Sequence, residues 1–181
     1  MHDPPVLLWT VLGLLAIERA FELGVNRRNS RVLRENGARW HGPRDGFGLI
    51  VAAQALLFAG TLFEGTSAAW GGVKPWTWYA IAGLALAQAL RYWCIGTLGW
   101  RWSVRVVTVP GAPRIAEGPY RYFPHPNYVA VMLEAVLLPL AFGAYATLLV
   151  AAPVQLAALW RRVRIEETAL NAAEAGAPRV E

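Results

Sequence analysis

Five long apolar segments constrain the fold of this chain more than any other feature of its sequence. Each segment is close to the length that a helix needs to cross the roughly 30 Å hydrocarbon core of a bilayer. Only 16% of the residues are charged, against about a quarter in soluble domains, and the segments lack the polar stripe of a helix in a soluble bundle. The sequence therefore predicts an all-α integral membrane protein, a single domain over residues 1–181, with five transmembrane helices at residues 5–25, 46–63, 76–96, 127–142 and 144–160.

The basic residues predict how these helices are oriented, because loops rich in Lys and Arg stay in the cytoplasm. Fourteen of the 17 basic residues fall in the loops at 26–45 and 97–126 and in the C-terminal tail, whereas Lys74 lies in a loop on the opposite side. We therefore expect the N-terminus outside and the C-terminus in the cytoplasm. The asymmetry also accounts for the net charge of +5, which suits an anionic inner leaflet and gives no reason to expect a nucleic-acid partner.

The connections between the apolar segments complete this prediction. The start of the chain, Met1 to Pro5, has neither a basic region nor a small-residue cleavage site, so the first segment is expected to stay in the mature protein. The last two segments meet at Phe142 to Tyr145 and are expected to form an antiparallel hairpin. The first helix is expected to continue to about Asn36-Gly37, and the fifth through Ala173. The β-branched residues from Val104 to Val109 predict a short cytosolic strand or hairpin.

Several ionisable residues lie within the apolar segments. Glu18, Arg19 and Glu22 occupy the cytosolic end of the first segment, Arg91 falls in the third, and Glu134 lies about two turns into the fourth. Two interpretations stay open, because intramembrane charges either neutralise one another or mark a functional site. If the charges neutralise one another, the expected pairs are Arg91 with Glu134 or Arg19 with Glu22. Hydrogen bonds between helices are expected from the amides of Gln54, Gln88 and Gln155.

A stiff, polar loop from Gly118 to Tyr128 leads into the fourth segment. Pro124 and Pro126 flank His125 and fix the backbone on both sides, so the imidazole is held in one direction. Asn127 is expected to be the N-cap of the fourth helix. The helix start leaves backbone N–H groups whose dipole favours a carboxylate. This pattern predicts a polar pocket at the cytosolic face.

Two carboxylates are expected at the same level of the membrane. Glu166 and Glu167 follow the fifth segment, and an antiparallel hairpin of similar helices returns them to the depth of His125. Carboxylates suit ribose hydroxyls or an ammonium group, and aromatic rings bind an adenine or a cationic centre; the rings here are Tyr120, Tyr122 and Tyr128. The alternative is a purely structural turn whose tyrosines lie at the membrane interface. The two carboxylates at the depth of His125 favour a functional pocket instead.

A metal site is not expected. The three histidines lie in unrelated segments, and Cys94, which is the single cysteine, lies in an apolar one. Metal sites need such side chains to converge. Neither a glycine-rich phosphate loop nor a serine-nucleophile elbow occurs.

The loop and the acidic pair also carry a family resemblance. The motifs are Gly118-Pro119-Tyr120-Arg121-x-x-x-His125-Pro126-Asn127-Tyr128, the upstream Thr97-Leu98-Gly99-x-Arg101-Trp102-Ser103, and Arg164-Ile165-Glu166-Glu167-x-x-Leu170 after the hairpin. In order and spacing these motifs resemble the isoprenylcysteine carboxyl methyltransferase family of membrane enzymes. They cover roughly the C-terminal half of the chain.

The resemblance implies an O-methyltransferase that uses S-adenosylmethionine, bound on the cytosolic side, and a lipophilic acceptor that enters from the bilayer. It implies that the cofactor site is lined by Tyr120, His125, Pro126, Asn127, Tyr128, Glu166 and Glu167. Arg164 is expected nearby, able to pair with the cofactor carboxylate or the acceptor. The catalytic candidates are His125 and Glu134, either of which could act as a base toward a phenol or enol, and Arg164.

The chain departs from the family pattern at two positions. The family usually has Arg before the histidine, where this chain has Pro124, and a small residue, often Gly, where it has Ala130. The missing Arg argues against a carboxylate acceptor. The short tail is more similar to a bacterial subgroup that methylates alkylpyrones and alkylresorcinols. Two rival functions stay open, namely an NADPH-dependent membrane reductase related to sterol reductases and a non-enzymatic membrane scaffold.

Overall fold

The computed structural model describes residues 6–42, 45–67 and 72–175 and consists of five helices with a two-stranded sheet. The helices are α1 (Val6–Glu35), α2 (Phe47–Gly65), α3 (Thr77–Leu98), α4 (Pro126–Ala141) and α5 (Tyr145–Ala175). Single 3₁₀ turns follow α3 and precede α4 at η2 (Gly99–Arg101) and η3 (Gly118–Arg121). The predicted start of the first span at Pro5, the loop residue Arg44 and the tail that carries Arg179 lie outside the described residues.

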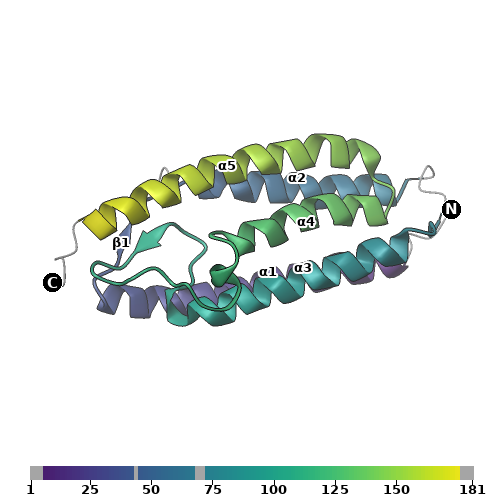
Figure 1. Ribbon diagram of the computed structural model, residues 1–181. Helices are drawn as coiled ribbons and strands as arrows, with labels where there is room; N and C mark the ends of the chain where they lie inside the picture. The colour runs from purple at the N-terminus through teal and green to yellow at the C-terminus, as the bar shows by residue number, and fades with distance from the viewer. Residues whose placement is uncertain (1–5, 43–44, 68–71, 176–181) are drawn as a thin grey trace.

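The helices alternate in direction along one bundle axis (Figure 1). The first described turn of α1 and the end of α5 lie at opposite ends of the bundle. Helix α4 packs between α3 and α5, while α2 packs mainly on α5. The predicted helical hairpin is confirmed, since α4 and α5 join through a turn in which Gly143 has φ 65°, a conformation that glycine adopts without strain.

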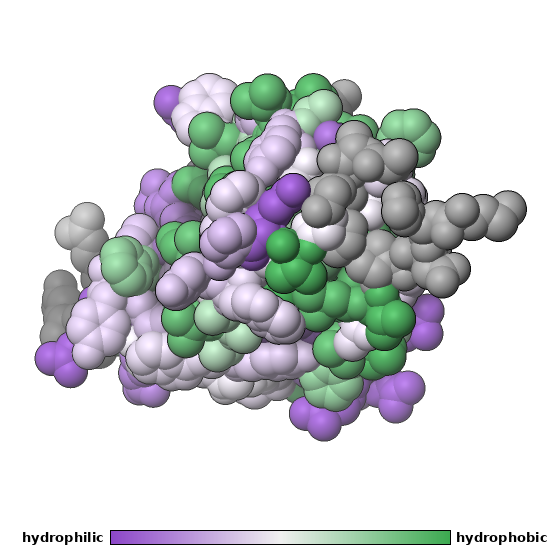
Figure 2. Space-filling model, turned by 90° about the vertical axis from the view of Figure 1, so that its right-hand side faces the viewer, coloured by the Kyte–Doolittle hydropathy of each residue, from purple (hydrophilic) through white to green (hydrophobic). Residues whose placement is uncertain are grey.

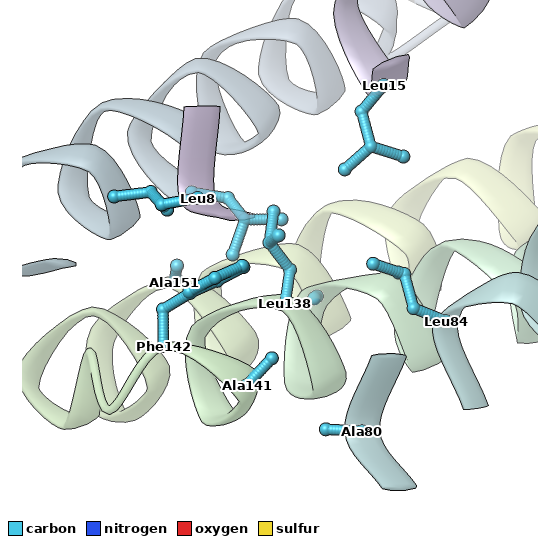
Figure 3. Close-up of a cluster of buried hydrophobic side chains, with 10 residues drawn as sticks. Leu8, Leu15, Ala80, Leu84, Leu138, Ala141, Phe142 and Ala151 are labelled. Atoms are coloured by element: carbon cyan, nitrogen blue, oxygen red, sulfur yellow. The ribbon is translucent and has the colours of Figure 1, made fainter. Parts of the chain in front are cut away.

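Small and aliphatic side chains fill the core between the helices (Figure 3). Phe142 is fully buried at the turn between α4 and α5 and packs with Leu8 and Leu138. Small residues let helix backbones approach closely, and Gly60 of α2 is an instance. A Cβ atom at Gly60 would lie 2.5 Å from the Thr147 Oγ1 atom of α5.

Length and composition fit an all-α membrane protein. Within the described residues, two stretches are long and apolar enough to cross a bilayer, Phe47–Gly65 and Thr77–Arg101, and the apolar helix Pro126–Ala141 is shorter. Figure 2 shows the bundle end near the start of α1, where hydrophobic and weakly polar side chains cover most of the described surface and strongly hydrophilic ones are scattered. The longer helices α1 and α5 have 30 and 31 residues.

The ends of α1 and α5 lie close to the predicted positions, and the sheet adds a pairing that was not predicted. Helix α1 ends at Glu35, with Gly37 at φ 68°, and α5 continues to Ala175. The predicted strand exists as β2 (Val107–Thr108), but it pairs antiparallel with β1 (Arg39–Trp40) rather than within its own loop. This pairing joins the two loops that the sequence assigns to the cytosolic side.

A buried polar network joins four helices inside the bundle. Glu134 of α4 accepts hydrogen bonds from Arg19 Nη2 of α1 at 2.6 Å and from Gln54 and Gln88 of α2 and α3 at 2.5 and 3.0 Å. Glu22 accepts from Arg19 at 2.9 Å and from Arg91. A buried charge needs such partners, because an unpaired one is costly in a medium of low dielectric constant.

The network corrects part of the sequence prediction. Arg91 pairs with Glu22 and not with Glu134, whereas the expected pair of Arg19 with Glu22 is confirmed. Bonds between helices are also confirmed for Gln54 and Gln88. The same prediction is wrong for Gln155, since its buried amide has no hydrogen-bond partner among the described residues.

Candidate functional site

A cleft of about 370 Å³ opens at the end of the bundle that carries the sheet and the last turns of α5. Its walls are the segment from Leu98 to Ala116, the segment from Tyr120 to Tyr128 and the C-terminal part of α5, together with Leu33 of α1. Its volume lies within the roughly 300–1,000 Å³ of typical ligand pockets. The polar side chains lining it include Arg101, Ser103, Arg105, Thr108, Arg114, Tyr120, His125, Asn127, Tyr128, Arg162, Glu166 and Glu167.

The imidazole and the acidic pair meet in this cleft. His125 Nε2 lies 2.8 Å from Glu167 Oε1, and His125 Nδ1 lies 3.9 Å from Glu166 Oε1. The Tyr128 hydroxyl donates to Glu166 Oε2, and the Tyr128 ring stacks on His125 with centroids 5.4 Å apart. The antiparallel hairpin therefore brings together groups 38 and 42 residues apart in the sequence.

The start of α4 differs from the prediction in one residue. His125 is the N-cap, and Pro126 occupies the first helical position, so the prediction of Asn127 as the N-cap is wrong. Proline favours that position because it has no N–H to satisfy and its φ already suits a helix. Asn127 instead lies one residue further on, and its buried Oδ1 atom has no hydrogen-bond partner among the described residues. A ligand donor in the cleft would satisfy this oxygen.

A buried group that the sequence reading missed supports one wall. Asp45 is fully buried and accepts from Arg105 Nε at 2.5 Å and from the Phe47 backbone N–H at 3.1 Å. Arg162 is also buried and donates to the carbonyl oxygens of Val104 at 2.7 Å and Asp45 at 3.2 Å. Its Nε atom donates to the Tyr128 hydroxyl at 3.3 Å.

These contacts fix protonation states around the cleft. Burial opposes the ionisation of Glu167, but hydrogen bonds from Arg114 and His125 outweigh it and hold the pKa of Glu167 below its ordinary value. Burial likewise opposes ionisation of Asp45, yet its bonds to Arg105 and the Phe47 N–H lower its pKa. Burial, with the neighbouring Cys94 thiol and Glu166 carboxylate, raises the pKa of Tyr120. The cleft therefore presents an ionised Glu167 and a neutral Tyr120 hydroxyl.

The structure brings most of the predicted site residues together in the cleft, and three of them do not line it. Tyr120, His125, Asn127, Tyr128, Glu166 and Glu167 all line the cleft. Pro126 is buried at the first position of α4 and does not line it. Glu134 lies in the buried polar network, and Arg164 is exposed with its guanidinium 4.7 Å from the Trp160 ring centroid. Neither lines the cleft, and Arg162 and Arg114 are the arginines near the acidic pair.

Comparison with known proteins gives one family and two relatives. Residues 79–172 match the isoprenylcysteine carboxyl methyltransferase (ICMT) family, a stretch that includes the cleft residues from Leu98 to Leu170. The chain is 31% identical over 167 residues to "Uncharacterized protein YpbQ" of Bacillus subtilis (strain 168), covering 91% of this chain and 97% of the relative. An "Uncharacterized protein" of Haemophilus influenzae is 28% identical over 171 residues, covering 90% of this chain and 93% of that relative. Among solved structures, none matches the chain.

Proposed function

This chain belongs to the isoprenylcysteine carboxyl methyltransferase family, and we propose that it is a membrane enzyme that transfers a methyl group from S-adenosylmethionine to an oxygen of a lipophilic acceptor. The observation that carries the proposal is the contact of His125 with Glu167 beside the contact of Tyr128 with Glu166. The family motifs thus converge in one cleft, although they are far apart in the sequence.

We propose that all five helices cross the cytoplasmic membrane with the cleft on the cytoplasmic side. Large apolar side chains point outward along α1 and α5, including Leu14, Ile17 and Phe21 on α1 and Leu149 and Leu156 on α5. Surfaces of this kind are stable next to lipid and not next to water. The loops that surround the cleft carry most of the arginines, which supports a cytoplasmic position for the cleft and the C-terminus.

The cleft residues fit S-adenosylmethionine in their chemistry. Its ribose hydroxyls and ammonium group would be bound by Glu166 and Glu167, and its adenine ring suits the aromatic surface of Tyr120. The buried Asn127 Oδ1 atom, which has no partner among the described residues, offers an acceptor for a ligand N–H or O–H group. When bound, this cofactor supplies an electrophilic methyl group on a sulfonium ion.

The residues of the chain would orient the acceptor and take up the proton of its hydroxyl group. Because Glu167 is ionised, it accepts a hydrogen bond, so His125 Nε2 carries the proton of their 2.8 Å contact. This tautomer leaves His125 Nδ1 as the proton acceptor for a phenol or enol hydroxyl. The imidazolium that forms is stabilised by the Glu167 and Glu166 carboxylates.

A hydroxyl acceptor suits this arrangement better than a carboxylate. An ionised carboxylate needs no base, whereas a phenol has a pKa of about 10 and gains from one. Pro124 also occupies the position at which the family usually has an arginine. We therefore propose a lipophilic phenol or enol, such as an alkylresorcinol or alkylpyrone, as the acceptor class.

The proposal is tested by incubating the purified protein with methyl-labelled S-adenosylmethionine and a lipid extract, then identifying the labelled lipid. We expect one lipophilic hydroxyl compound to gain the label with wild-type protein and none with the His125→Ala variant. Binding of NADPH in place of S-adenosylmethionine would instead identify a reductase. Absence of saturable binding of either molecule would leave a scaffold.

A further inference from the structure

Arg114 connects the two walls of the cleft at its rim. Its Nη1 atom lies 3.1 Å from Glu167 Oε2, and its Nη2 atom donates to Asn171 Oδ1 at 2.8 Å. Both partners belong to α5, whereas Arg114 belongs to the opposite wall. The side chains of Arg114 and Glu167 are 36% and 33% exposed, so the pair lies where a ligand would enter.

The loop that presents Arg114 is held in place by its own contacts. Arg101 Nη1 donates to the Pro113 carbonyl oxygen at 2.8 Å, directly before Arg114. The preceding turn closes with a hydrogen bond from Ala112 N to Val109 O at 3.2 Å. Gly111 in that turn has φ 72°, which glycine adopts at no steric cost. A guanidinium on such a loop is preorganised, so little conformational entropy of the loop is lost when a ligand binds.

The proposed cofactor ends in an amino acid, which carries an ammonium group and a carboxylate. Glu166 and Glu167 suit the ammonium group, and an arginine suits the carboxylate, because its two parallel N–H groups match the two oxygens. Four arginines line the cleft in the described part of the chain: Arg101, Arg105, Arg114 and Arg162.

Three of these arginines are bound to groups that support the protein's own fold. Arg101 donates to Pro113, Arg105 pairs with the buried Asp45, and Arg162 donates to the carbonyls of Asp45 and Val104. Arg114 differs, because one of its partners, Glu167, is itself part of the proposed cofactor site.

We infer that Arg114 binds the carboxylate of the amino-acid end of the cofactor, and that it leaves Glu167 as the ligand enters; this inference rests on the proposed function. The exchange keeps every charge paired, since Arg114 gains the ligand carboxylate while Glu167 gains the ligand ammonium group. The pair that breaks is weak, because ion pairs exposed to water contribute little. Arg114 thus bridges the rim of the cleft in the ligand-free protein and binds the ligand carboxylate in the complex.

The test compares two ligands that differ only in this carboxylate. S-adenosylhomocysteine keeps it, and 5′-deoxy-5′-(3-aminopropylthio)adenosine lacks it. Equilibrium dissociation constants are measured for both ligands with the purified full-length wild-type protein and the Arg114→Gln variant. We expect the wild type to favour S-adenosylhomocysteine by about tenfold, near the lower end of what a hydrogen bond to a charged group contributes. The variant should bind the two ligands equally and should not bind the decarboxylated ligand more weakly than the wild type does.

Two control variants separate this role from a general effect of charge or folding. Arg121→Gln removes an exposed arginine that does not line the cleft, and it should keep the tenfold preference. Asn171→Ala removes another partner of Arg114 without changing any charge, and it should keep the preference as well.

Two results would overturn the inference while leaving the proposed function intact. If Arg114→Gln keeps the wild-type preference, another group reads the carboxylate. If the variant loses affinity for both ligands by the same factor, Arg114 only braces the loop. Failure of wild-type protein to bind either ligand would be a different result, because it would remove the proposed function and the inference with it.

Discussion

Replacing Asp45 by Asn tests whether the wall behind the cleft depends on one buried charge. The Asn side chain can still accept the Phe47 N–H, but it has no charge for Arg105 and Arg162, and its NH₂ group replaces an acceptor. Removing one member of a buried ion pair costs about 3–5 kcal/mol. Because Arg162 keeps two carbonyl acceptors, we expect the lower end, about 3 kcal/mol.

This loss of stability can be measured by thermal unfolding in detergent, followed through the fluorescence of the nine Trp residues. For a chain of this length 1 kcal/mol lowers Tm by about 2–4 °C, so Asp45→Asn should melt roughly 6–12 °C below the wild type. The control Arg105→Gln removes a partner that is 35% exposed and leaves Asp45 its charge and its contact with Arg162, so it should lower Tm by less than Asp45→Asn does. An Asp45→Asn variant that melts with the wild type would refute the reasoning.

The pH dependence of the same variant has a defined sign. The native pKa of Asp45 lies below its ordinary value of 3.8, so its stabilisation is complete above that value and is lost as the pH falls through the native pKa. The difference in Tm between wild type and Asp45→Asn should therefore stay constant at neutral pH and shrink below about pH 4. A difference that shrinks already between pH 6 and 8 would contradict this assignment.

Three further predictions concern the site, the buried polar network and the start of α5. His125→Ala and Glu167→Ala should each abolish methyl transfer while the protein still inserts into membranes, as assayed with labelled cofactor and membrane fractionation; retained turnover would contradict their roles. Glu134→Ala should cost about 3 kcal/mol, because it leaves Arg19, which is only 20% exposed, with fewer partners. It should not change the cofactor affinity of the folded protein, and weaker binding at unchanged Tm would contradict this. Glu64 accepts the Ala146 and Thr147 backbone N–H groups at the start of α5, so Glu64→Ala should cost about 1 kcal/mol, visible as a lower Tm with unchanged binding.

The positions of the helices could be predicted from the sequence because apolar runs of this length fold as helices in lipid. The convergence of His125 with Glu166 and Glu167 could also be predicted, since a short turn at Gly143 forces the hairpin to be antiparallel. Both results depend on local pattern and helix geometry alone.

Helix geometry also explains two residues that the prediction misplaced. Arg164 is two residues from Glu166, and residues at that spacing point to different sides of a helix, whereas Arg162 is four residues away and shares the face of Glu166. Glu134 follows His125 by nine residues, which is about two and a half helical turns. It therefore lies on the opposite side of α4 from His125 and faces the buried polar network.

The contacts of Asp45 and Arg114 could not be predicted in this way. Both residues lie in loops, and their partners Arg162 and Glu167 are 117 and 53 residues away. No periodic pattern connects such positions, because the path of each loop is set by tertiary packing. The pairing of β1 with β2 has the same origin.

The most direct test of the account is an experimental structure of the protein with S-adenosylhomocysteine. The account predicts the ligand in the cleft, with its amino group beside Glu167, its sulfur near His125 and its carboxylate on Arg114. A ligand bound anywhere else, or a cleft that stays filled by side chains at saturating ligand, would contradict it.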